Sequence, residues 1–181
     1  MTRRFNIGPN DVQVALVLFS EAANVEWGLK RYWDKTSLIN AIHNLRYIGE
    51  TTNLNDALRL TWSNVFARGR GTRPDARKVT VILTDGEDNV PIQGTPLTLQ
   101  NATRCKNDGI RLIAVGVSDM IDRSRLMQIV SSSSDFYSVK NFIALKSIVD
   151  DLTQQICATP ATSSIVTHST YTYCITNIMS S

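Results

Sequence analysis

Several carboxylate side chains follow a single apolar run in this sequence. The stretch VILTDGEDN, residues 81–89, places Asp85, Glu87 and Asp88 directly after a run typical of a buried strand. Carboxylate and hydroxyl oxygens are the ligands that hard divalent cations such as Mg²⁺ prefer. The stretch therefore indicates a cation site, with a solvated turn as the alternative. A hairpin at Asp85-Gly86 is disfavoured, because no strand follows within a few residues.

The cysteines and histidines give weaker signals. Cys105, Cys157 and Cys174 are an odd number and show no Cys-x-x-Cys spacing, which disfavours a zinc site or a redox pair. Cys105 lies in a helical apolar stripe and is expected to be a buried free thiol. His43 and His168 are far apart and close to no serine or cysteine in a triad-like motif, so we do not expect triad catalysis.

Composition and missing motifs exclude further classes. A net charge of +3, with Lys and Arg scattered, does not indicate nucleic-acid binding, and no apolar run reaches the ~20 residues of a membrane helix. There is no Gly-x-Gly-x-x-Gly or Walker loop, so a nucleotide site is disfavoured. The amino-terminal stretch MTRRFNIGPN lacks the apolar core of a signal peptide. Asn101-Ala102-Thr103 is a glycosylation sequon, meaningful only if the protein is secreted.

The hydrophobic pattern alternates between strand-like and helix-like segments. Apolar runs predict strands at 12–19, 78–84, 110–117 and 136–139, with an edge strand at 24–29. Helical spacing predicts helices at 34–46, from 53 or 55 to 66, at 98–108, at 122–130 and at 142–157. This order predicts an α/β fold, a doubly wound and mostly parallel sheet with helices on both faces. Ligands bind such sheets beyond the carboxyl ends of the strands, where Asp85 is expected.

A length of 181 residues favours one domain, which we place at 1–157, followed by a tail. Residues 158–181 are rich in Ser and Thr and show no helical period. This composition predicts a flexible tail: either a linker, with or without O-linked sugars, or an unstructured end.

Five blocks in order and register resemble the von Willebrand factor type A (vWA) domain, most of all the extracellular-matrix kind of matrilins and non-fibrillar collagens. The similarity covers roughly residues 5–157, and its blocks are FNIGPNDVQVALVLFS, YIGETTNLNDAL, VTVILTDGEDN, GIRLIAVGVSD and DFYSVKNFIALKSIVDDLTQQIC. The resemblance implies a doubly wound, Rossmann-like fold with a metal-ion-dependent adhesion site at its carboxyl edge, which holds Mg²⁺ or Mn²⁺.

The resemblance assigns two metal ligands and leaves one loop without a match. Thr52 matches the second-loop threonine of the family, with Thr51 one position away as the alternative, and Asp85 matches the third-loop aspartate. The Asp-x-Ser-x-Ser of the first loop is absent; Asp122 begins a similar run but is better explained as a helix N-cap. We therefore expect weak or absent metal binding in this chain. Glu87 and Asp88 are candidates for partner binding, or else solvated charges.

The resemblance also implies that the chain is amino-terminally truncated and lacks the family's first central strand and first helix. In the family that strand lies between the strands matched here by 12–19 and 78–84. We expect either that these two strands close the gap or that an exposed apolar seam remains, and hence that the chain is poorly stable alone. Cys157 matches a cysteine that closes matrix-type domains by a disulfide; its partner would lie in the absent segment, with Cys174 as a possible substitute.

The resemblance favours a non-enzymatic, extracellular adhesion module that binds an acidic or collagen-like partner on a matrix or cell-surface protein. Two alternatives remain. One is a metal-dependent hydrolase or transferase that uses Asp85 as metal ligand or nucleophile. The other is an intracellular vWA scaffold, which Cys157 and the sequon disfavour.

Overall fold

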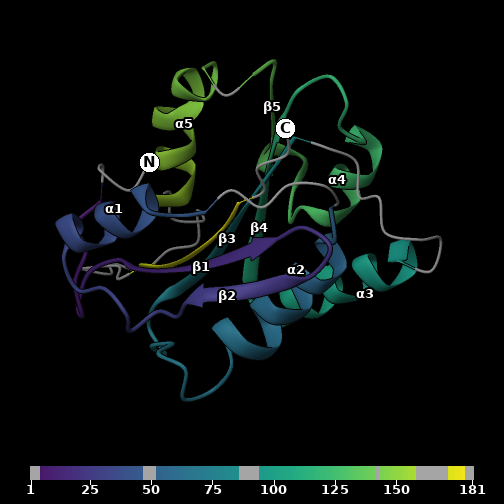
Figure 1. Ribbon diagram of the computed structural model, residues 1–181. Coiled ribbons are helices and arrows are strands. Elements are labelled where there is room, and N and C mark those ends of the chain that lie inside the picture. Colours follow the sequence, from purple (N-terminus) through teal and green to yellow (C-terminus); the bar gives the residue numbers. More distant parts are fainter. Residues whose placement is uncertain (1–4, 47–51, 86–93, 142, 158–170, 178–181) are drawn as a thin grey trace, which may run out of the picture.

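The computed structural model describes residues 5–46, 52–85, 94–141, 143–157 and 171–177. Strands and helices alternate along most of the chain, as predicted (Figure 1). The strands are β1 (Gln13–Phe19), β2 (Ala23–Trp27), β3 (Arg77–Thr84), β4 (Ile110–Val117), β5 (Phe136–Val139) and β6 (Tyr171–Asn177). The α-helices are α1 (Lys35–His43), α2 (Leu54–Leu60), α3 (Gly94–Asn107), α4 (Arg123–Ile129) and α5 (Leu145–Cys157), with a π-helical turn at Thr61–Val65 and a 3-10 turn at Ser133–Asp135.

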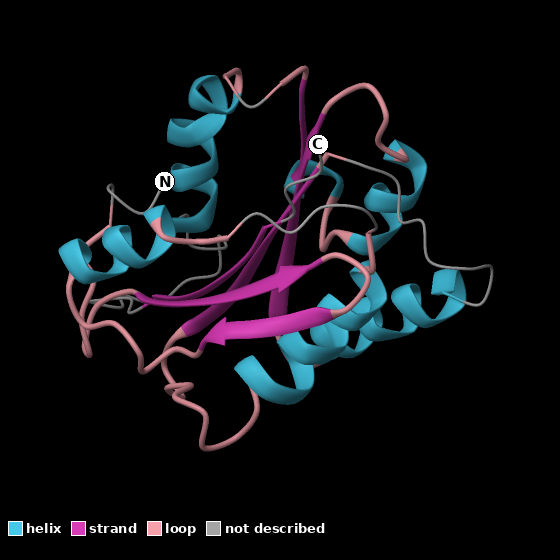
Figure 2. Cartoon of the chain, viewed as in Figure 1, coloured by secondary structure: helices cyan, strands magenta, loops and turns pink. Residues whose placement is uncertain are grey.

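The six strands form one sheet in the order β2-β1-β6-β3-β4-β5. All neighbours are parallel except β1 and β2, which form an antiparallel pair at one edge. The prediction of a mostly parallel α/β sheet is therefore confirmed, and so is the edge position of the second strand. Parallel neighbours require long crossover connections, and the helices between the strands supply them (Figure 2).

Helices cover both faces of the sheet. Alternate side chains of β1 point to opposite faces and belong to two different hydrophobic cores. Ala15, Val17 and Phe19 pack with apolar residues of α2, α3 and α4 on one face. Val14, Leu16 and Leu18 pack with residues of α1 and α5 on the other. All seven residues of β1 are buried. This two-sided burial explains why the strand is a near-continuous apolar run in the sequence.

Side-chain caps fix the starts of three helices where the sequence predicted them. The carboxylate of Asp34 accepts a hydrogen bond from the Ser37 backbone N–H at 2.8 Å, and the Asn53 side chain caps α2 in the same way. Asp122 caps α4 and accepts from the Arg125 N–H at 2.9 Å. Asp122 therefore acts as the predicted N-cap.

The strand β6 corrects two expectations about the gap in the sheet. The expectation of a flexible tail at 158–181 is wrong for Tyr171–Asn177, which form a strand between β1 and β3; the rest of that segment lies outside the described residues. The neighbouring strands do not close the gap, and no seam is left open between them, because β6 runs parallel to both. The physical reason is the cost of unpaired backbone groups in buried strands. A strand between β1 and β3 pairs with the backbone N–H and C=O groups of both.

Candidate functional site

The candidate site lies at the edge of the sheet where the parallel strands end. β1 ends at Phe19, β3 at Thr84, β4 at Val117 and β5 at Val139. Since these strands are parallel in one sheet, the loops that follow them leave from the same edge. We call this edge, with the loops after β1, β3 and β4 and the start of α2, the carboxyl edge.

Thr52 belongs to a short segment that is fastened to the end of β1. The next residue, Asn53, donates its backbone N–H to the Ser20 carbonyl at 2.8 Å and its side-chain amide to the Glu21 carbonyl at 2.9 Å. The Asp56 carboxylate accepts from the Ala23 N–H at 3.0 Å. The first turn of α2 is therefore tied to the turn after β1, and Thr52, only 3% exposed, is held at the carboxyl edge.

Asp85 directly follows the last residue of β3. Its backbone carbonyl accepts a hydrogen bond from the Ser118 hydroxyl at 2.7 Å. Ser118 follows β4, and its own N–H donates to the Val139 carbonyl at 3.0 Å. One serine thus links the ends of β3, β4 and β5 and restrains the backbone that carries Asp85.

Ser118 has a backbone φ of +135°, a region that favours glycine. Its hydroxyl also accepts from the Met120 N–H at 3.1 Å, and these two side-chain bonds help to hold the unfavourable conformation. Strain of this kind costs of order 1–3 kcal/mol and concentrates at functional sites. The sequence patterns did not identify Ser118 as a site residue. The signal that could have found it is its position, since Ser118 directly follows one buried strand as Asp85 directly follows another.

Two predicted ligands therefore lie at one edge, on segments tied to strands that flank β6. A threonine hydroxyl and a carboxylate are hard oxygen donors, so their chemistry fits a divalent cation, but they supply two of the six oxygens that Mg²⁺ takes. Glu87, Asp88 and Thr51 lie outside the described residues. Within the described part of the chain, no group of three or more His, Cys, Asp and Glu side chains is placed to hold a metal ion.

The glycosylation candidate Asn101 is buried in α3, with 4% of its surface exposed. Its amide nitrogen, the atom that would carry a glycan, donates to the Asn55 side-chain oxygen at 2.8 Å. Its oxygen accepts from the Arg104 guanidinium at 3.1 Å. In the folded chain this nitrogen is engaged and the residue is buried, which disfavours a glycan; glycosylation of Asn101 stays a prediction.

The three cysteines lie on three different elements. Cys105 is a buried free thiol, as predicted, and burial, with a smaller effect from Asp108, raises its pKa to about 12. Cys157 ends α5, and its side chain lies outside the described ones. Cys174 lies in β6, opposite Ala15 on one side and Thr80 on the other. The disulfide of Cys157 stays a prediction.

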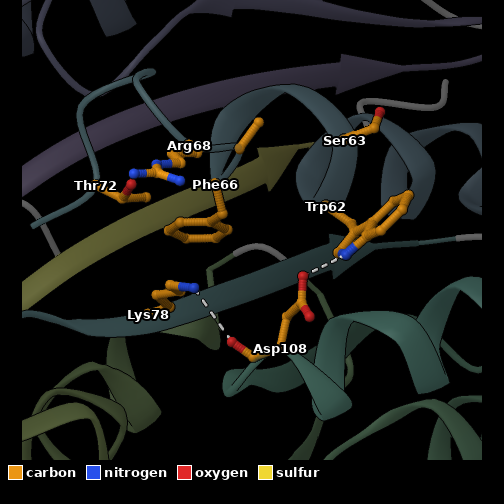
Figure 3. A pocket seen from close by; sticks show the side chains of 8 residues that line it. Trp62, Ser63, Phe66, Arg68, Thr72, Lys78 and Asp108 are labelled. Carbon is orange, nitrogen blue, oxygen red and sulfur yellow. Dashed lines mark hydrogen bonds between the residues drawn. The ribbon is translucent and has the colours of Figure 1, made fainter. Parts of the chain in front are cut away.

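A shallow pocket of about 530 Å³ lies away from the carboxyl edge, near the start of β3 (Figure 3). Trp62 and Lys78 both bind Asp108: the indole N–H donates to its carboxylate and the ammonium donates to its backbone carbonyl at 3.2 Å. These polar groups therefore fasten the end of α3 to the π-helical turn and to β3. Trp62, Lys78 and Asp108 therefore have a structural role in this pocket.

Comparison with known proteins is consistent with this geometry. The family model described as "von Willebrand factor type A domain" matches residues 1–151. The chain is 36% identical over 155 residues to the collagen alpha-1(XII) chain of Notophthalmus viridescens and 30% identical over 158 residues to the human collagen alpha-6(VI) chain. The aligned parts cover 84% and 87% of this chain but 16% and 7% of those collagens, so the chain spans a small part of their length.

A solved structure has a similar fold. Proximal thread matrix protein 1 from the mussel byssus, in a form with a "zinc occupied MIDAS motif", superposes with a TM-score of 0.75 at 29% identity. The match covers 86% of this chain and 38% of that protein. In this chain, no helix among the described residues is both long and apolar enough to cross a membrane.

Proposed function

The chain belongs to the von Willebrand factor type A family, and on this premise we propose that it is a non-enzymatic interaction module of the extracellular matrix. The observation that carries the proposal is the carboxyl edge, where hydrogen bonds hold Thr52 and Asp85 on rigid ends of the sheet. A protein partner that contacts Thr52 and Asp85 meets positions already held by the sheet, which lowers the ordering cost of binding. The collagen relatives and the thread matrix protein support a matrix location, and hence an extracellular one.

A divalent cation gives the carboxyl edge a way to bind acidic partners. In a complete domain, the Thr52 hydroxyl and the Asp85 carboxylate would hold Mg²⁺ or Mn²⁺ together with further oxygens. Such a cation supplies a hard Lewis acid with an open position for a carboxylate of the partner. We propose a matrix or cell-surface protein with an acidic or collagen-like segment as the partner, and Glu87 and Asp88 as residues that contact its rim.

In this chain the cation site is proposed to be incomplete. The resemblance places the first ligand loop of the family, Asp-x-Ser-x-Ser, after its first central strand, and β6 occupies the position of that strand here. β6 carries the sequence YTYCITN, and the 181-residue sequence contains no Asp-x-Ser-x-Ser. Two monodentate oxygens barely offset the cost of dehydrating Mg²⁺, so the affinity is expected to be low.

An enzymatic role is the second candidate, with Asp85 as nucleophile or metal ligand. A hydrolase or transferase of this type needs a base or a phosphate-binding loop near Asp85. One described contact at Asp85 is a serine hydroxyl that donates to its backbone carbonyl and restrains the end of β3. We favour the adhesion role, because the relatives are matrix proteins and the sequence has no phosphate-binding loop or nucleophile motif.

Calorimetric titration of the metal-free chain with MgCl₂ and MnCl₂ tests the cation proposal. We expect binding weaker than about 0.1 mM, abolished by Asp85→Ala and weakened by Thr52→Ala. Asp119→Ala, an acidic residue of the neighbouring loop, is the matched control and should leave binding unchanged. Micromolar affinity would contradict the incomplete site, and equal binding by Asp85→Ala would contradict the assignment of Asp85.

Binding to immobilised matrix proteins tests the interaction role separately. We expect collagen-containing matrix to retain the chain in Mg²⁺, and Asp85→Ala to reduce retention while far-UV circular dichroism stays unchanged. Retention that is equal for the wild-type chain and for Asp85→Ala would place the contact away from the carboxyl edge. No retention on any matrix protein would contradict the proposed function.

A further inference from the structure

β6 lies between β1 and β3, and we call the position that it fills the slot. β6 pairs with Gln13–Leu18 of β1 on one side and with Arg77–Leu83 of β3 on the other, parallel to both. β1 and β3 do not pair with each other in the sheet. Each flanking strand therefore presents a full edge of backbone donors and acceptors toward the slot, and any strand that fills it satisfies both edges at once.

We propose that β6 is exchangeable: the slot accepts the Tyr171–Asn177 segment of a second copy of this chain, so that two copies pair by exchanging their β6 strands. A backbone ladder does not distinguish a strand of its own chain from the same strand of another, since hydrogen bonds and side chains are identical. Only the connection to the rest of the chain favours the strand of the same copy. This inference does not rest on the cation site.

The length of the connection allows exchange. Residues 158–170 separate the end of α5 from the start of β6, which is 13 residues. Fully extended, 13 residues span at most roughly 45 Å, which exceeds the ~30 Å diameter of a small domain. A covalent connection of this length gives the strand of the same copy an effective concentration of up to about the millimolar range, so exchange is expected mainly when the chain refolds at high concentration.

The slot restricts which segments can fill it, because the flanking strands β1 and β3 are covered by apolar cores on both faces of the sheet. Val14 and Leu16 of β1 and Val79 and Val81 of β3 belong to one core. Ala15 and Val17 of β1, with Ile82 of β3, belong to the other. An occupant must therefore place alternate side chains on two covered faces. A segment with proline in the middle lacks one N–H and leaves a ladder hydrogen bond unmade, which weakens its pairing.

A labelled peptide of residues 171–177 measures the slot directly. Added to the full chain, the peptide competes with the chain's own β6. Its apparent affinity is therefore lower when fewer chains have an open slot. Ile175→Pro in the full chain weakens its own β6, and we expect the peptide to bind this variant about tenfold more tightly or better. The same peptide with Ile175→Pro, and a scrambled peptide, are the controls and should not bind. Failure of the peptide to bind the Ile175→Pro chain, when far-UV circular dichroism shows that this chain is folded, would overturn the proposal.

A second measurement needs no variant and so remains decisive if Ile175→Pro does not fold. Two wild-type chains with different affinity tags are unfolded, mixed and refolded together at about 1 mM, and then diluted. We expect a mixed dimer that carries both tags, and that separates only when the chains are unfolded again. Exclusively monomeric chains after refolding would overturn strand exchange.

Discussion

Deletion of β6 should abolish cooperative folding. In a parallel ladder, alternate residues direct both backbone groups to one neighbour, so removing Tyr171–Asn177 leaves roughly twelve N–H and C=O groups of β1 and β3 without partners. Gln13–Leu18 are all buried, and so are Val79–Ile82. At about 1 kcal/mol for each group, the low end of the range, the loss is ~12 kcal/mol before any relaxation. This is comparable to the whole stability of a typical domain, ~5–15 kcal/mol.

Urea unfolding of two truncated chains measures this effect. A chain that ends at Thr170 lacks β6, whereas the matched control that ends at Asn177 retains it. Far-UV circular dichroism and the fluorescence of the buried Trp27 report the transition. We expect a cooperative transition for the control and a broad or absent one for the shorter chain. If both chains unfold cooperatively, with free energies of unfolding within about 1 kcal/mol of each other, the reasoning on the ladders is refuted.

Three further predictions concern groups that are not proposed ligands of the cation. Asp135→Ala removes the carboxylate that binds Arg111, and should lower the free energy of unfolding by about 2–4 kcal/mol in urea, less than for a fully buried pair because the Arg111 side chain is 29% exposed. The Cys105 thiol should resist iodoacetamide at pH 8 in the folded chain and react in urea. Because burial raises its pKa from 9.0 to about 12, the stability it contributes should be present below pH 9 and lost as the pH rises toward 12; pH-dependent urea curves measure this loss. Asp122→Ala should cost about 1 kcal/mol in thermal unfolding through loss of the α4 cap, whereas Asp119→Ala, which caps no helix, should cost less.

Most strands and helices could be predicted because their signals are local. A strand covered on both faces, such as β1, is apolar at every position, and a helix such as α5 repeats its apolar residues every three or four positions. The caps Asp34 and Asp122 were predictable for the same reason, since a cap bonds to a backbone N–H three residues away. The placement of Asp85 at the carboxyl edge followed from the alternation alone.

The fates of Asn101 and Ser118 depended on contacts between distant segments. A sequon is defined by three residues, but the burial of Asn101 comes from Asn55 on another helix. Ser118 restrains Asp85 across two neighbouring strands, a contact between residues 33 positions apart. No local pattern encodes either contact.

The sequence by itself determined the alternation of elements, the edge that carries Asp85 and the helix caps, because each depends on residues a few positions apart. Only the tertiary structure decided that YTYCITN is a central strand. Tyr, Thr and Ile favour strands, but in a Ser- and Thr-rich context the segment has no apolar run to predict a buried one. It becomes a strand because residues 13–18 and 77–83, far away in the chain, present two unsatisfied backbone edges that a strand from residues 171–177 can satisfy together.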